Sequence, residues 1–314
     1  MIMVFLHTDK TRFMNVINQT SALSGIDRSY IEKDYYVFML LKLIRFYDDQ
    51  VMFKGGTSLS RGWGILPRFS EDIDLNLLPE VPSTDSTRQR FARAAYQALL
   101  DMGFNYDKTK MYSRREYNTF IQPYSPIFGN NALASDLKIE TMANKKGKIL
   151  NATYTPRIIS NYIWDAMSSN HKYAEILTNF GLNPFEINVQ NMDVTFVEKV
   201  ISLTNNYIRG NSFRLSRHLY DIFYMWNCGN LKNFDLRYTM EETKRHLLER
   251  QNDVCLRQDI PASVILRKAL YSDFYRNDFY TVTTGMKHNQ NDGVTYEMCK
   301  DTLLGIIDTQ LVQF

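Results

Sequence analysis

Residues 53–75 decide the fold of this chain, and they read Phe-Lys-Gly-Gly-Thr-Ser-Leu-Ser-Arg-Gly-Trp-Gly-Ile-Leu-Pro-Arg-Phe-Ser-Glu-Asp-Ile-Asp-Leu. The apolar residues 51–53 predict the end of a buried strand, which Gly55-Gly56 interrupts. A short helix is expected over residues 57–62, and a second strand over residues 70–75. The stretch therefore predicts a glycine turn and a helix between two strands.

The second strand carries an Asp-x-Asp pair. Side chains alternate along a strand, so Ser70, Asp72 and Asp74 are expected to share one face. Two neighbouring carboxylates repel each other and resist burial unless a cation lies between them. Mg²⁺ is the usual cation, held by one or two carboxylates and by phosphate oxygens of a substrate. An isolated Asp-x-Asp pair is also common at solvated strand ends, but the preceding Gly-Gly turn favours a Mg²⁺ site at Asp72 and Asp74, with Mn²⁺ as an alternative ion.

The Gly55-Gly56 turn predicts a phosphate site next to this metal pair. Glycine lets backbone N–H groups approach phosphates closely at the start of a helix. A phosphate cradle and a metal pair on adjacent segments are what nucleotidyl transfer requires. The hydroxyls of Thr57 and Ser58 are expected to assist.

Length and composition set the limits on the class of protein. The chain has 314 residues, of which 44% are hydrophobic and 23% charged, as in an ordinary globular protein with ample core. The net charge of +3 gives no global signature of polyanion binding, although a local basic groove remains compatible with it. Cys228, Cys255 and Cys299 are widely spaced and favour a reducing compartment over a disulfide framework or a zinc site. No apolar run approaches a membrane span and no signal peptide is evident, so a soluble, cytoplasmic protein without a membrane partner is expected.

The rest of the chain predicts helices around a few strands. Helices are expected over residues 9–24, 30–47, 88–103, 195–203, 239–251, 262–275 and 296–311, and strands over residues 105–112, 117–124, 136–142 and 185–192. Asp27 or Ser29 is the expected cap of the second helix, and Asp193 the expected cap of the helix that follows the last strand. Glu32 and Asp34 are interpreted as a charged first turn. Whether Lys33 reaches the active cleft stays open.

The Gly-Gly turn followed by Asp-x-Asp resembles the first motif of the DNA polymerase β-like nucleotidyltransferase superfamily. The longer string from Lys54-Gly-Gly-Thr-Ser-Leu to Arg68-Phe-Ser-Glu-Asp-Ile-Asp-Leu resembles, more narrowly, the AbiEii/AbiGii toxin family of bacterial toxin–antitoxin and phage-defence loci. This resemblance implies an α+β fold. A polymerase β-like nucleotidyltransferase domain with a mixed sheet and N-terminal helices is expected over residues 1–190, and a helical C-terminal domain that completes the active-site cleft over residues 191–314.

Two later segments resemble further motifs of the same family. Residues 193–203 contain Lys199, which the resemblance makes a phosphate-binding lysine, although a lysine reaching out from a core face is the alternative. Residues 213–224 place Arg214, Arg217, His218 and Asp221 at helical spacing, so one helix face is expected to carry all four. Asp221 is expected to pair with Arg217, Arg214 or Lys199. A purely structural ion-pair network is the alternative.

Glu140 and the basic stretch at residues 144–148 allow two interpretations each. Glu140 shares a strand face with Asp136 and Lys138, which is typical of a solvated face. The superfamily resemblance instead implies a third carboxylate of the active site. Residues 144–148 are either a solvated turn or a contact for nucleic-acid phosphates.

The resemblance implies a Mg²⁺-dependent enzyme that moves a nucleoside monophosphate from an NTP to an acceptor and releases pyrophosphate. The implied catalytic residues are Asp72, Asp74, Lys199 and Asp221. The residues implied to contact substrate are Lys54, Gly55, Gly56, Thr57, Ser58, Arg68, Ser70, Glu140 and Arg217. The expected acceptor is the 3′ end of tRNA, and a cognate antitoxin is the expected partner. A protein or small-molecule acceptor, and a non-catalytic nucleotide-binding partner of an antitoxin, are the alternatives.

Overall fold

The computed structural model describes residues 4–107, 112–114, 117–129, 136–143, 154–250, 260–288 and 292–312, without the side chains of residues 230 and 246–250. Residues 144–148 and Cys255 lie outside this part of the chain. The described residues form two compact units. The sheet unit comprises those within 1–62, 70–147 and 154–189, and the helical unit comprises residues 63–69 and those within 190–314.

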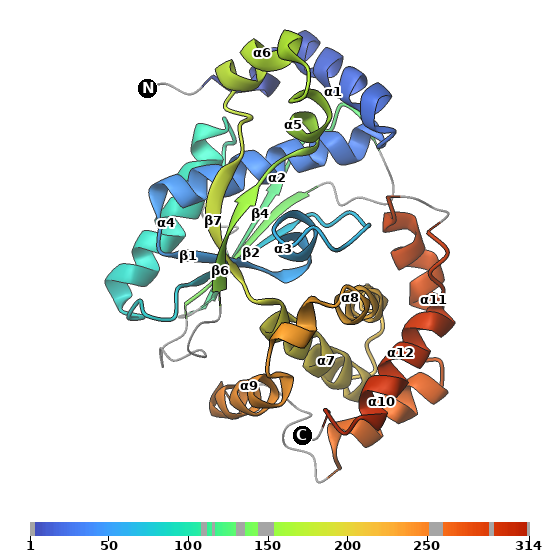
Figure 1. The fold of residues 1–314 in the computed structure, drawn as a ribbon. Coiled ribbons are helices and arrows are strands. Elements are labelled where there is room, and N and C mark those ends of the chain that lie inside the picture. Colours follow the sequence, from blue (N-terminus) through green and yellow to red (C-terminus); the bar gives the residue numbers. More distant parts are fainter. Residues whose placement is uncertain are drawn as a thin grey trace. The chain divides into compact units, whose positions relative to one another are not determined.

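A mixed seven-stranded sheet organises the sheet unit as far as it is described, in the order β3-β4-β5-β2-β1-β7-β6 (Figure 1). Its strands are β1 (Val51–Lys54), β2 (Asp72–Leu77), β3 (Tyr112–Arg114), β4 (Tyr117–Pro123), β5 (Asp136–Met142), β6 (Tyr154–Ile159) and β7 (Phe185–Gln190). The central strand β2 is antiparallel to β1 and parallel to β5. Strand β1 is in turn parallel to β7. The segments before and after the glycine turn therefore become neighbouring strands at the centre of the sheet.

The helices of the sheet unit are α1 (Lys10–Ser24), α2 (Arg28–Tyr47), α3 (Gly55–Arg61), α4 (Asp85–Asp101), α5 (Tyr162–Met167) and α6 (Ala174–Asn179). Helices α2 and α4 pack against each other and against the sheet (Figure 1). Asp27 caps α2 by accepting a hydrogen bond from the backbone N–H of Ser29 at 2.9 Å. Nearly all of α2 is buried, which makes it the central helix of this unit.

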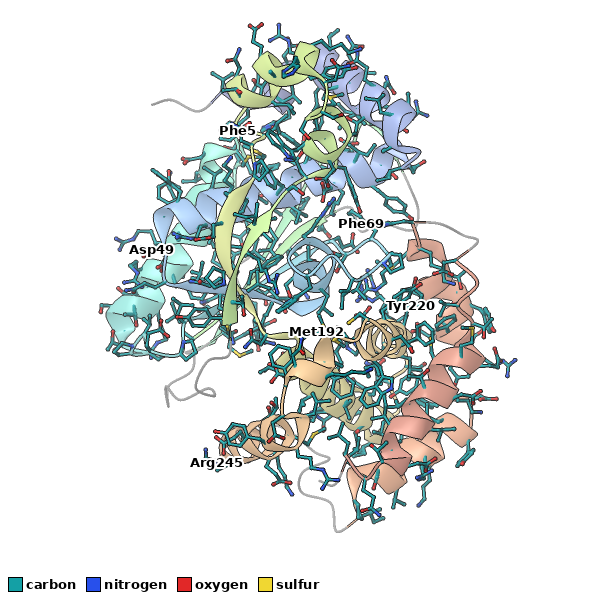
Figure 2. All side chains as sticks on the ribbon, viewed as in Figure 1. Phe5, Asp49, Phe69, Met192, Tyr220 and Arg245 are labelled. Atoms are coloured by element: carbon teal, nitrogen blue, oxygen red, sulfur yellow. The ribbon has the colours of Figure 1, made fainter. Side chains whose placement is uncertain are left out.

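The helices of the helical unit are α7 (Met192–Ile208), α8 (Ser216–Asn227), α9 (Leu236–Arg250), α10 (Ala262–Tyr271), α11 (Arg276–Asp278) and α12 (Tyr296–Asp308). Helix α7 packs against α8, α9 and α10, and α8 packs against α12 (Figure 1). The interior is aromatic and apolar and includes Tyr220 of α8, which Figure 2 labels. None of the helices in the described residues is long and apolar enough to span a membrane.

Residues 63–69 belong to the helical unit although sheet-unit segments precede and follow them in the chain. The indole N–H of Trp63 donates to the carbonyl of Gln190 at 3.0 Å. The backbone N–H of Phe69 donates to the carbonyl of Met286 at 2.8 Å, and Arg68 forms an isolated antiparallel bridge with Lys287. The segment is therefore held by backbone contacts from the C-terminal part of the chain.

The structure confirms the α+β class with a mixed sheet and a helical C-terminal region, and it corrects several local expectations. Residues 105–107 are not a strand, and the described strand β3 covers Tyr112–Arg114. Helix α7 begins at Met192, so Asp193 lies in its first turn instead of capping it. Arg214 precedes α8 with a φ of 60° and is not on that helix. Strand β6 was not anticipated.

Candidate active site

The acidic side chains predicted from the Asp-x-Asp pattern lie together on the central strands of the sheet. Because β2 and β5 are parallel, Asp72 pairs with Lys138 and Asp74 pairs with Glu140. Along β2, Asp72 and Asp74 are partly exposed, whereas Ile73 and Leu75 between and after them are buried. One side of this strand pair therefore carries Asp72, Asp74 and Glu140 next to the Lys138 ammonium group, and Asp136 lies at the start of the same face of β5.

Asp74 lies in the most unfavourable position for a negative charge. Burial, together with the nearby carboxylates of Asp72 and Glu140, raises the pKa of Asp74 to about 8. Its Oδ2 atom lies only 2.1 Å from the position that a Cβ atom at Gly55 would occupy. Gly55 also has a φ of 79°, which favours glycine. Glycine at position 55 therefore lets the backbone turn pass directly against the Asp74 carboxylate.

Glu140 has one cationic partner and one hydroxyl partner. Its Oε1 atom accepts from the hydroxyl of Tyr117 at 2.6 Å and lies 2.5 Å from the Lys138 ammonium. Burial opposes ionisation of Glu140, but Lys138 and Tyr117 outweigh burial and lower the pKa of this carboxyl. Glu140 thus belongs to the acidic cluster, and Tyr117 and Lys138 are neighbours that the sequence pattern did not single out.

The glycine turn and β2 are joined by hydroxyl groups. The Thr57 hydroxyl donates to the Asp72 carbonyl at 2.6 Å and lies 3.0 Å from the Ser70 hydroxyl. The Ser58 hydroxyl instead donates to the Gly55 carbonyl at 2.9 Å. Lys54 pairs with Asp74 across β1 and β2. Thr57 and Ser70 therefore fix the start of the acidic strand against the short helix α3.

The helical unit contains a second buried charged cluster, in which cations outnumber carboxylates. It is centred on Asp221 of α8. Arg68 donates to both Asp221 carboxylate oxygens, at 2.7 and 2.6 Å, and the Lys199 ammonium of α7 lies 2.8 Å from Oδ2. All three side chains are buried. Burial alone would raise the pKa of Asp221, but Arg68 and Lys199 outweigh it and hold the pKa well below its usual value. The predicted Lys199–Asp221 pair is present, and Arg68 is a partner that the sequence analysis did not assign to Asp221.

His218 and Arg217 adjoin this cationic cluster. The Nδ1 atom of His218 lies 3.4 Å from the Lys199 ammonium. Burial, followed by the charge of Lys199, lowers the pKa of His218 well below 6.5. The Nε of Arg217 donates to the carbonyl of Arg214 at 3.0 Å. With two cations against one carboxylate, the cluster retains positive charge.

The donor set fits a divalent cation held by two carboxylates. Asp72 and Asp74 offer hard oxygen ligands, and the crowded negative charge around Asp74 would be relieved by a cation. Within the described residues, no group of three or more His, Cys, Asp or Glu side chains is arranged to hold a metal ion. The chain would therefore supply two carboxylates, and substrate phosphates and water would complete the coordination.

Comparisons with known proteins define the class. Residues 40–291 match the family described as the nucleotidyl transferase AbiEii toxin of type IV toxin–antitoxin systems. This match covers most of the chain, and the protein therefore belongs to the AbiEii nucleotidyltransferase toxin family. It is a nucleotidyltransferase, as the sequence motifs predicted.

Two of the solved structures to which this chain is similar are bacterial proteins. MenT4, a nucleotidyltransferase toxin from Mycobacterium tuberculosis, is 13% identical, with a TM-score of 0.46 over 95% of this chain and 97% of that protein. JHP933 from Helicobacter pylori is 12% identical, with a TM-score of 0.44 over 89% of this chain and 92% of that protein. No curated protein matches the sequence.

Proposed function

We propose that this nucleotidyltransferase moves a nucleoside monophosphate from an NTP to the 3′ end of tRNA in a Mg²⁺-dependent reaction. One observation carries the reaction type: the chain holds an acidic cluster in which crowded carboxylates raise the pKa of Asp74, and a second cluster in which two cations surround one carboxylate. In a metal–triphosphate complex, the positive metal ion complements the acidic cluster and the negative phosphates complement the cationic cluster. In this proposal both clusters serve the same reaction.

The acidic cluster would bind the metal and the reacting phosphate. Asp72 and Asp74 are the proposed ligands of Mg²⁺, which when bound neutralises phosphate charge and orients the attacking and leaving oxygens. The backbone at Gly55-Gly56, with Lys54, Thr57, Ser58 and Ser70, is proposed to accommodate the triphosphate. Glu140, held by Tyr117 and Lys138, is proposed to contact substrate beside Asp74.

The cationic cluster would stabilise charge on the departing pyrophosphate. Lys199 is the proposed phosphate-binding cation, acting as a point charge. Asp221 orients both Lys199 and Arg68, because its two oxygens bind both groups. Arg217 is proposed to add positive charge next to them. These groups are already fixed by buried contacts, and such preorganised charge is the main way in which enzymes stabilise a transferring phosphoryl group.

The family membership supports an antitoxin as partner, and tRNA is the acceptor that we propose among RNA, protein and small molecules. The test uses each α-³²P-labelled NTP with Mg²⁺ and total bacterial RNA, comparing the wild-type protein with Asp72→Ala/Asp74→Ala. Label in a tRNA-sized band that the double variant loses supports the proposal and identifies the nucleotide. Label on a polypeptide, or on no macromolecule, contradicts the tRNA acceptor. NTP binding without any transfer would favour a non-catalytic partner of an antitoxin.

A further inference from the structure

Three consecutive charged residues at the start of α2 are buried, which was not expected for the first turn of a surface helix. The exposed fractions are 0% for Glu32, 0% for Lys33 and 5% for Asp34. Burying charges is unfavourable unless each finds a partner with good geometry. Each of the three does, and each partner lies in a different segment of the sheet unit.

Lys33 contacts the start of both strands that carry the acidic cluster. Its ammonium donates to the carbonyl of Asp136, the first residue of β5. It also lies 3.7 Å from Oε2 of Glu71, the residue directly before β2. Glu71 is itself 2% exposed and points away from the face of Asp72, because the two are adjacent in the chain. One buried cation therefore joins the beginnings of two parallel strands.

Glu32 and Asp34 hold neighbouring segments in the same way. The Glu32 carboxylate accepts from the backbone N–H groups of Ile127 at 2.8 Å and Phe128 at 2.9 Å. Asp34 forms an ion pair with Arg61, the last residue of α3, and accepts from the N–H of Tyr162 at 2.8 Å. Asp34 thus holds α3 against α2, and the neighbouring residue Lys33 holds the start of β2 against the same helix.

We infer that Lys33 is a positioning residue of the enzyme: by binding Glu71 and the Asp136 carbonyl, it fixes the strand ends that carry Asp72, Asp74 and Glu140. Asp72 is the first residue of β2, where a strand has no earlier pairing to hold it. A displacement of about 1 Å in a reacting group can lower a rate about a hundredfold. The inference rests on the proposed function and deepens it. Of its two tests, only the measurement of nucleotide transfer requires that the proposed function is correct.

A matched control lies on the same helix. Lys42 also buries its stem and donates to two backbone carbonyls, those of Gly181 at 2.7 Å and Asn183 at 2.8 Å. These carbonyls belong to the loop before β7 and not to the acidic strands. Lys33→Met and Lys42→Met therefore remove the same side-chain type from α2, and each should lower the melting temperature.

The rate of nucleotide transfer should differ between Lys33→Met and Lys42→Met. Lys33→Met is expected to reduce the transfer rate by about 30- to 100-fold, and Lys42→Met to change it by no more than about twofold. A third variant, Lys33→Met/Glu71→Met, replaces the buried ion pair by apolar groups and should recover much of the melting temperature. We expect its transfer rate to stay as low as that of Lys33→Met, because the anchor is still missing.

Amide hydrogen exchange tests the anchor without any acceptor. Exchange in peptides covering residues 71–77 and 136–142 should be about fivefold faster or more in Lys33→Met. In Lys42→Met, the faster exchange should be confined to residues around 181–183. The inference is overturned if the double variant regains wild-type transfer along with its stability, or if exchange at the two strands is unchanged. If the wild-type protein transfers no nucleotide, the proposed function fails and the exchange measurement still decides the role of Lys33.

Discussion

Two aspartates, one in each unit, have pKa values shifted in opposite directions. Asp74 in the sheet unit lies among other carboxylates, and its pKa rises to about 8. Asp221 in the helical unit lies between Arg68 and Lys199, and its pKa falls well below the usual value. Burial raises the pKa of both carboxyls, so the difference in their charged neighbours accounts for the opposite directions of the two shifts.

This difference indicates what each cluster can bind. In the Asp221 cluster, the carboxylate is paired with two cations, so the cluster retains positive charge, as in a site for an anion. In the Asp74 cluster, the three carboxylates of Asp72, Asp74 and Glu140 outnumber the nearby ammonium groups of Lys54 and Lys138, as in a site for a cation. The following predictions test this contrast, beginning with the largest expected effect.

Loss of the carboxylates at the sheet should abolish catalysis. Asp72→Asn or Asp74→Asn is expected to lower nucleotide transfer by about a thousandfold or more, because the metal would lose a charged ligand. Steady-state transfer of labelled nucleotide is the measurement. Asp101→Asn, which alters another carboxylate of the sheet unit, should retain the wild-type rate. Full activity in the Asp72→Asn or the Asp74→Asn protein would remove the substituted residue from the proposed mechanism.

Loss of the carboxylate in the helical unit should instead unfold the protein more readily. Asp221→Asn leaves two buried cations without their shared counter-ion, which is expected to reduce the free energy of unfolding by about 3–5 kcal/mol. Urea denaturation gives this number. Asp308→Asn removes the carboxylate of an exposed pair with Arg267 and should change stability by less than about 1 kcal/mol. Equal effects of the two substitutions would contradict the central role of Asp221.

Two alanine substitutions can distinguish the effect of the close contact between Gly55 and Asp74 from the effect of backbone strain. Gly55 and Gly103 share a φ of 79°, but a Cβ atom would collide with Asp74 only at Gly55 and would meet nothing within 4 Å at Gly103. Both alanine substitutions should cost about 1 kcal/mol of stability from the positive φ. Only Gly55→Ala should also reduce transfer, by about tenfold to a hundredfold. A matching loss of activity in Gly103→Ala would assign the effect to strain.

The smallest expected effect concerns acid stability. The pKa of His218 is lowered by burial, so the unfolded chain binds a proton near pH 6.5 that the folded protein does not bind. Stability should therefore fall as the pH drops below 6.5, by at most about 1.4 kcal/mol per pH unit from this group. His218→Gln should flatten the dependence of the unfolding free energy on pH between 6.5 and 5. His171→Gln, at an exposed histidine, should not.

The local patterns of the sequence predicted the acidic site well, and pairings across the chain were harder to predict. Residues 136–142 were predicted as a strand with the bounds that β5 has, because alternation of polar and apolar side chains is a local signal. Placing Glu140 next to Asp74 required the family resemblance, since the parallel pairing of β2 and β5 is not local.

The partners of buried charges could not be read from spacing. Arg68 and Asp221 are separated by 153 positions, and nothing in either segment specifies the other. Lys33 and Glu71 likewise both resemble surface residues in sequence, because charged residues are mostly exposed. The helical face proposed for Arg214 also failed, because the backbone before α8 turns through a left-handed conformation at that residue.

The position of residues 63–69 limits how this protein can be divided by truncation. A fragment starting at residue 190 would contain Lys199 and Asp221 but would lack Arg68, which supplies two of the hydrogen bonds to Asp221. A fragment ending at residue 189 would carry Arg68 without its carboxylate. A truncation between residues 189 and 190 would therefore place Arg68 and Asp221, which form a buried ion pair, on different fragments. Two fragments made by this cut would have to associate before Arg68 could bind Asp221 again.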